Sequence, residues 1–151
     1  MDSNSFDTDL KIGERAERFL LEKLREEFPT LKKIEGYNPE YDLIDDNEYS
    51  FEVKLDMRSR TTGNVGIEYR HNGLPSAIST STAMEWIIIY YFSTWRYSRV
   101  KTTLLRSYIK NNWEWFTKVK GKYDKSSLVL IPTKELEECF FCYDVKLLQA
   151  T

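Results

Sequence analysis

The chain has 151 residues, of which 41% are hydrophobic and 30% are charged, and its formal net charge is −2. This composition is ordinary for a soluble globular protein and provides enough residues for one domain with one core. It argues against a membrane-spanning protein, because no apolar run approaches the roughly 20 residues that a transmembrane helix needs.

In chain order, the first nine residues are acidic and polar. They do not resemble a signal peptide, so we expect a flexible N-terminus at 1–9 and a cytoplasmic protein. An apolar stripe with spacings of three and four then predicts a helix over 10–28, which Pro29 ends. Two short strands are expected at 31–35 and 41–44.

The clearest strand is expected over 49–57, where apolar and polar residues alternate with a period of two. We expect a polar loop over 58–64, followed by a strand over 65–69 that pairs antiparallel with the strands before it. Residues 76–84 predict a short helix. The run of isoleucines and aromatic residues over 86–92 predicts a buried strand.

The last third of the chain continues to alternate helices and strands. A helix is expected over 102–111, a basic loop over 118–125, a strand over 128–131 and a helix over 134–139. No internal repeat or linker interrupts this order. The sequence therefore predicts a single mixed α/β domain over residues 1–151.

Charge is distributed unevenly along the chain. Residues 93–126 contain nine basic and two acidic residues and carry +7, so the remainder carries −9. Aromatic residues in the same segment could stack on nucleic-acid bases while the cations follow the backbone. A solvated basic surface is the alternative. The better candidates for phosphate contact are Arg96, Arg99, Lys101 and Lys122.

The two cysteines, Cys139 and Cys142, form a Cys-x-x-Cys pair, which can be redox-active or supply half of a zinc site. No second cysteine pair or histidine cluster in the sequence completes a tetrahedral site. The two phenylalanines between them favour buried or partly buried thiols over redox or zinc chemistry.

Three charged residues on two neighbouring predicted strands could carry chemistry. Glu52 and Lys54 are two apart, so both side chains lie on one face of their strand, and Asp42 lies on the strand before it. Two carboxylates from adjacent strands suit Mg²⁺, and the backbone carbonyl of Val53 could supply a further oxygen. Lys54 could orient a water molecule or stabilise charge that develops on a phosphate. The alternative is an ordinary surface ion pair.

The order of these residues resembles the PD-(D/E)xK nuclease superfamily, which includes restriction enzymes, Holliday junction resolvases and phage recombination nucleases. The family's aspartate is matched by Asp42 and its Glu-x-Lys pair by Glu52 and Lys54. An acidic residue on the preceding helix is matched by Glu14. Tyr41 stands where the family's nominal proline precedes the aspartate, a position that varies among members.

Further stretches at 62–69, 73–76 and 121–127 look like phage and bacterial members of the group. The resemblance implies a restriction-endonuclease-like fold, with a central mixed β-sheet flanked by helices. It also implies a Mg²⁺- or Mn²⁺-dependent nuclease that hydrolyses DNA phosphodiester bonds, structure-selective like the Holliday junction resolvases or acting in phage recombination or repair.

On this interpretation, Asp42, Glu52 and the Val53 carbonyl hold the metal, and Lys54 positions the nucleophilic water. Glu14 assists through water or a second metal, although it could instead be an exposed residue paired along its helix. Two-fold assembly would suit the cutting of both strands. A non-catalytic nucleic-acid-binding module of the same fold and a protein-interaction domain are the alternatives.

Overall fold

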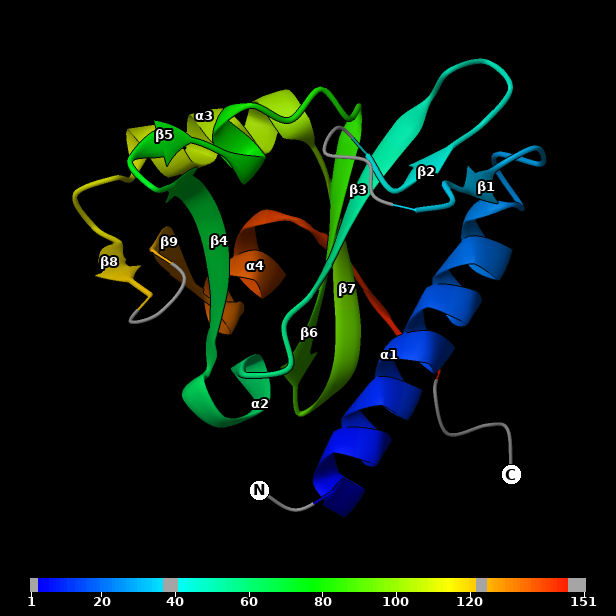
Figure 1. Cartoon of the computed structure of the whole chain (residues 1–151), viewed down its shortest axis with the longest axis horizontal. Coiled ribbons are helices and arrows are strands. Elements are labelled where there is room, and N and C mark those ends of the chain that lie inside the picture. The colour runs from blue at the N-terminus through cyan, green and yellow to red at the C-terminus, as the bar shows by residue number, and fades with distance from the viewer. Residues whose placement is uncertain (1–2, 37–40, 122–124, 147–151) are drawn as a thin grey trace.

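The computed structural model of the chain describes residues 3–36, 41–121 and 125–146, with side chains from Thr8 onward. These residues form an α/β fold with four α-helices around a mixed central sheet (Figure 1). No helix in this part of the chain combines the length and the apolar character that crossing a membrane requires.

The helical elements within the described residues are α1 (Ser3–Leu24), α2 (Ser59–Thr62), the 3-10 turn η1 (Ala77–Ser79), α3 (Thr102–Asn111) and α4 (Thr133–Cys139). The strands are β1 (Lys32–Lys33), β2 (Leu43–Ile44), β3 (Ser50–Leu55), β4 (Asn64–His71), β5 (Leu74–Pro75), β6 (Glu85–Phe92), β7 (Thr94–Lys101), β8 (Thr117–Lys120), β9 (Ser126–Pro132) and β10 (Phe141–Asp144).

The strands form two sheets. The larger has the order β1-β2-β3-β6-β7-β10, and the smaller has the order β5-β4-β9-β8. All pairs in both sheets are antiparallel except β3 and β6, which run parallel and make the larger sheet mixed. The prediction that β4 pairs with the strands before it was wrong, because β4 pairs with β5 and β9 in the smaller sheet.

Helix α1 covers one face of the larger sheet (Figure 1). Its buried residues Ala16, Leu20 and Leu24 pack with Phe51 of β3 and Ile87 of β6. The predicted apolar stripe is therefore the face of α1 that contacts the sheet. The helix begins earlier than predicted, since residues 3–9 continue it toward the N-terminus.

The opposite face of the larger sheet packs toward the smaller sheet, α3 and α4. Trp86, Ile88 and Tyr90 of β6 join Val65 of β4 and Leu136 of α4 in one buried cluster. Strand β6 is thus buried on both faces, which explains why it is a continuous apolar run instead of an alternating one. The predicted strand over 86–92 is confirmed, and it is buried as far as Tyr90, whereas Phe92 is exposed.

Several predicted boundaries were wrong for identifiable reasons. The expected loop over 58–64 contains α2, because the Asp56 carboxylate accepts a hydrogen bond from the Ser59 N–H (3.0 Å) and supports its first turn. The helix expected over 76–84 is only the turn η1. The loop expected over 118–125 includes part of β8. Strands β7 and β10 were not predicted, whereas α3 and α4 were.

Candidate active site

Asp42 is held against β3 by both its backbone and its side chain. Its N–H donates to the Phe51 carbonyl at 2.8 Å, and its Oδ2 accepts a hydrogen bond from the Val53 N–H, also at 2.8 Å. The Asp42 carboxylate therefore accepts a hydrogen bond that a backbone carbonyl would accept if β2 extended further. Asp42 directly precedes β2 and lies level with Glu52 in the register of β2 and β3. Its Oδ1 accepts no hydrogen bond within the described residues.

The Glu52 carboxylate lies beside Lys54, with 3.1 Å between Oε1 and Nζ. The Glu52 side chain is only 13% exposed, whereas that of Lys54 is 48% exposed. Lys54 Nζ also lies 5.9 Å from the centroid of the Trp86 ring. Both charged side chains thus lie on the face of β3 opposite α1, as the period of two predicted.

Burial raises the pKa of the Glu52 carboxyl above its ordinary value, because a buried carboxylate loses its hydration. The positive charge of Lys54 lowers this pKa, and the negative charge of Asp42 raises it again. The balance remains on the raised side, so the charge of Lys54 does not fully offset the burial of Glu52.

The backbone of Val53 faces the same edge as the Asp42 carboxylate. In an extended strand, the N–H and C=O of one residue point to the same side. Since the Val53 N–H reaches Asp42, its carbonyl oxygen lies on that side too. The edge of β3 therefore offers a backbone oxygen near the two carboxylates.

Glu14 lies on the α1 side of this edge. It lines a pocket of about 420 Å³ together with Arg18, Lys33, Asp42 and Val53. The side chain of Glu14 is exposed and forms no ion pair with Arg18. The structure thus brings Glu14 to the pocket that Asp42 lines, but from the opposite side of the sheet to Glu52.

Within the described ranges, no three histidine, cysteine, aspartate or glutamate side chains converge on one metal position. The donor set at this edge is therefore two carboxylates and a backbone carbonyl. Such a set does not suit zinc, which takes four tetrahedral ligands in structural sites. It does fit Mg²⁺, which is bound through one or two carboxylates and keeps several waters.

Asp56 shares the face of Glu52, but both of its carboxylate oxygens accept hydrogen bonds from the protein backbone. Its Oδ1 accepts from the Ser59 N–H at 3.0 Å, and its Oδ2 accepts from the Gly66 N–H at 2.8 Å. It therefore ties β3 to α2 and to β4. This contact fixes the smaller sheet beside the candidate site.

Two of the four basic residues predicted to contact DNA form ion pairs with protein carboxylates. Arg96 bonds to Glu137 at 2.8 Å and to Asp144 at 2.7 Å. Arg99 is similarly bound, with 2.7 Å from Nε to Glu85 and 2.7 Å from Nη1 to Glu27.

Of the other two residues predicted to contact DNA, the structure describes only Lys101. Lys101 is exposed at the end of β7. Lys122 lies outside the described residues.

The cysteines are both free thiols. Cys139 is exposed, whereas Cys142 is half-buried with its Sγ 3.2 Å from the Leu136 carbonyl oxygen. Burial raises the pKa of the Cys142 thiol to about 11, which disfavours the reactive thiolate. Nothing in their surroundings singles them out as a chemical site.

A second group of basic and aromatic residues was missed by the sequence analysis. Arg106 and Lys110 of α3 line a groove with Tyr69, Arg70 and Trp113. The unusual charge of residues 93–126 was the available signal. It could not tell which cations of the segment have acidic partners, because those partners lie far away in the sequence.

Searches of protein-family models, curated proteins and solved structures return no match to this chain. The likeness to nucleases therefore depends on the order of Glu14, Asp42, Glu52 and Lys54, and on the geometry described above.

Proposed function

We propose that the protein is a metal-dependent nuclease of the PD-(D/E)xK type, with a restriction-endonuclease-like fold, that hydrolyses DNA phosphodiester bonds. The observation that carries this proposal is the half-buried Glu52, level with Asp42 and 3.1 Å from Lys54. It brings two carboxylates, which can hold a divalent cation, and one ammonium, which can stabilise negative charge, to one sheet edge.

Asp42 and Glu52 are the residues that would hold Mg²⁺ or Mn²⁺, with the Val53 carbonyl as a further ligand. The Val53 N–H occupies Asp42 Oδ2 and thereby orients the carboxylate, which leaves Oδ1 for the ion. A bound ion would polarise a phosphodiester oxygen and lower the pKa of a coordinated water. The pKa of Glu52 is raised chiefly by burial and further by the charge of Asp42, and a bound divalent cation would offset both effects on the ionised carboxylate.

Lys54 would act on the reacting groups themselves. Its ammonium is half exposed and can therefore turn from Glu52 Oε1 toward solvent, where a phosphate would lie. There it can hydrogen-bond the attacking water or stabilise the negative charge that develops on the phosphate. Glu14 would assist from the α1 side of Asp42 through a water molecule.

The substrate we favour is branched or otherwise structured DNA, as for Holliday junction resolvases. A dimer would allow both strands to be cut.

The test is cleavage of plasmid, single-stranded and four-way-junction DNA with Mg²⁺, Mn²⁺ or EDTA. We expect cleavage only with metal, and a loss of about 10²–10³-fold in Lys54→Ala, comparable to removal of one donor that stabilises a transition state. Lys23→Ala is the matched control, because Lys23 is 53% exposed and pairs with Glu26 at 3.1 Å.

Equal, metal-independent cleavage by wild type and Lys54→Ala would overturn the proposal. DNA binding without cleavage in any metal would instead assign the chain as a non-catalytic binding module.

A further inference from the structure

A groove of about 790 Å³ lies between β4, η1 and α3, outside the candidate active site. Its residues combine positive charge with an apolar and aromatic floor. Those that matter here are Tyr69, Arg70, Ile78, Arg106, Lys110 and Trp113.

Among the residues that the structure describes, those that line this groove include three cations and no carboxylate. The pocket beside Asp42 differs, because its Arg18 and Lys33 are balanced by glutamates. Arg70 and Lys110 are exposed and form no ion pair within the described residues. Their charge is therefore available to an external anion.

Arg106 is held in place by the protein backbone. Its Nε donates to the Ile78 carbonyl at 3.0 Å, and its Nη2 donates to the Ser81 carbonyl at 2.9 Å. These bonds satisfy part of the guanidinium without neutralising its charge. Arg106 is thus a pre-positioned cation, which loses little side-chain entropy when it meets a phosphate.

The floor of the groove can accept the apolar part of a nucleotide. Tyr69 and Trp113 meet edge to face with 4.9 Å between ring centroids. Lys118 lies nearby, with its Nζ 4.9 Å from the Trp113 ring centroid, and adds a further positive charge. Cations beside aromatic rings are the combination with which proteins follow a nucleic-acid strand.

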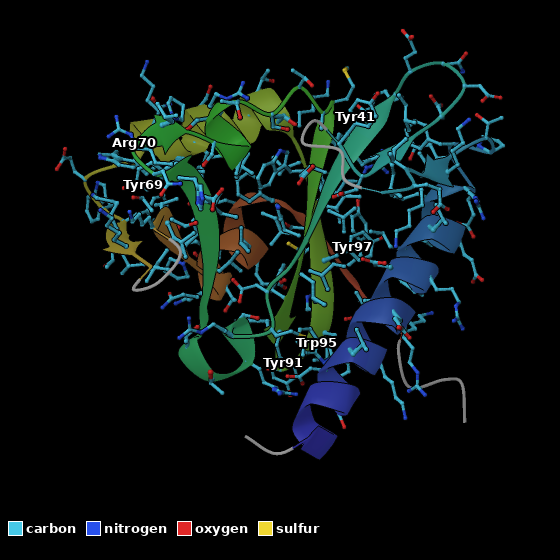
Figure 2. The ribbon with its side chains drawn as sticks, viewed as in Figure 1. Tyr41, Tyr69, Arg70, Tyr91, Trp95 and Tyr97 are labelled. Atoms are coloured by element: carbon cyan, nitrogen blue, oxygen red, sulfur yellow. The ribbon has the colours of Figure 1, made fainter. Side chains whose placement is uncertain are left out.

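Direct contacts connect the groove to the candidate active site. Lys54 lies over the Trp86 ring, Trp86 Nε1 donates to Ser81 Oγ at 3.0 Å, and the Ser81 carbonyl accepts from Arg106. The pair formed by Trp86 and Ser81 therefore lies between Lys54 and Arg106. In Figure 2, Tyr69 and Arg70 lie at the upper left, and Tyr41, which immediately precedes Asp42, lies to the upper right of centre.

We propose that this groove binds the sugar-phosphate backbone of DNA, at nucleotides beyond the phosphate that is cut. Arg70, Arg106 and Lys110 contact phosphates, and Tyr69 and Trp113 contact the sugar or base. The inference rests on the proposed nuclease function for its choice of ligand, but it concerns binding and not chemistry.

The experiment measures the affinity for a short fluorescein-labelled DNA duplex by anisotropy, in EDTA and over a series of salt concentrations. The Arg70→Ala/Lys110→Ala variant is compared with wild type and with Lys23→Ala/Lys134→Ala. The control removes the same charge from exposed lysines on α1 and α4. Both Arg70 and Lys110 are exposed, so neither substitution disturbs the core.

We expect the groove variant to bind about tenfold more weakly, and its slope of log affinity against log salt to fall by about 1.8, or 0.9 for each lost phosphate contact. The control should change neither quantity. Charge-conserving Arg70→Lys/Lys110→Arg should keep most of the affinity.

Equal affinity and equal salt slope in the groove variant and wild type would overturn the inference, even if wild type cuts DNA. Conversely, weaker binding by the groove variant would uphold it even if wild type cuts no DNA with any metal, in which case the nuclease proposal alone fails. Absence of DNA binding by wild type at every salt concentration would overturn the inference.

Discussion

Two glutamates with similarly low exposure behave in opposite ways in this protein. The side chain of Glu52 is 13% exposed and that of Glu137 is 17% exposed. Burial raises the pKa of both carboxyl groups. For Glu137, hydrogen bonds from Arg96 and Tyr90 outweigh burial and leave the pKa below its ordinary value. For Glu52, a single ion pair with Lys54 does not.

The difference shows which carboxylate the fold itself satisfies. Glu137 joins α4 to β6 and β7 through Tyr90 and Arg96, so its charge is used within the structure. Glu52 instead lies level with a second carboxylate, Asp42, whose charge acts on it, and it accepts from a lysine that is half exposed. A carboxylate left with a raised pKa beside another acid is a candidate for function, whereas one with a lowered pKa in a hydrogen-bond network is a structural residue.

The largest expected effect is on cleavage. Glu52→Gln keeps the shape of the side chain but removes its charge, so it should lower metal-dependent DNA cleavage by about 10²–10³-fold. Glu137→Gln should leave the rate per folded molecule unchanged. Initial rates with Mg²⁺ measure both, after the folded fraction has been determined by circular dichroism.

Equal losses of activity in the two glutamine variants would contradict this comparison. Such a result would mean that Glu52, like Glu137, acts only by supporting the fold.

Stability should respond in the reverse order. Glu137→Gln leaves Arg96 without its main charged partner, and should lower the free energy of unfolding by about 2 kcal/mol. Glu52→Gln should not destabilise the protein at neutral pH. The raised pKa means that the native state favours protonated Glu52, so ionisation at higher pH costs stability in wild type. Urea denaturation at pH 7 tests both variants.

A lower midpoint for Glu52→Gln than for Glu137→Gln would reverse the assignment of the two residues. The slope of the free energy of unfolding against urea concentration should be the same in wild type and both variants, because the surface exposed on unfolding is unchanged.

The local patterns predicted much of the fold. The apolar stripe of α1, the alternation of β3 and the apolar run of β6 each depend on residues close in the sequence. Strand β7 was missed because Arg96 and Arg99 interrupt its apolar character. Their acidic partners Glu27 and Glu137 come from distant segments, and no local pattern reveals such pairing.

The candidate site was predictable in part for the same reason. Glu52 and Lys54 share a face by the strand period alone, and the position of Asp42 level with Glu52 follows from one turn between neighbouring antiparallel strands. The separation of Glu14 from Glu52 by the sheet was not predictable, because it depends on which face α1 covers. The groove at Arg106 likewise requires contacts among β4, η1 and α3.

The smallest expected effect separates the role of Lys54 as a neighbour of Glu52 from its role in cleavage. Metal binding needs the ionised carboxylate, so Mn²⁺ affinity should fall as the pH decreases through the raised pKa of Glu52. Lys54→Met keeps the length of the side chain but removes the charge that lowers this pKa. The acid-side loss of Mn²⁺ binding, followed by calorimetry, should therefore begin at a higher pH in Lys54→Met than in wild type. Lys23→Met should not shift it, because Lys23 pairs with Glu26 on α1. A shift to lower pH in Lys54→Met would mean that the lysine competes with the metal for Glu52 more than it favours the ionised carboxylate.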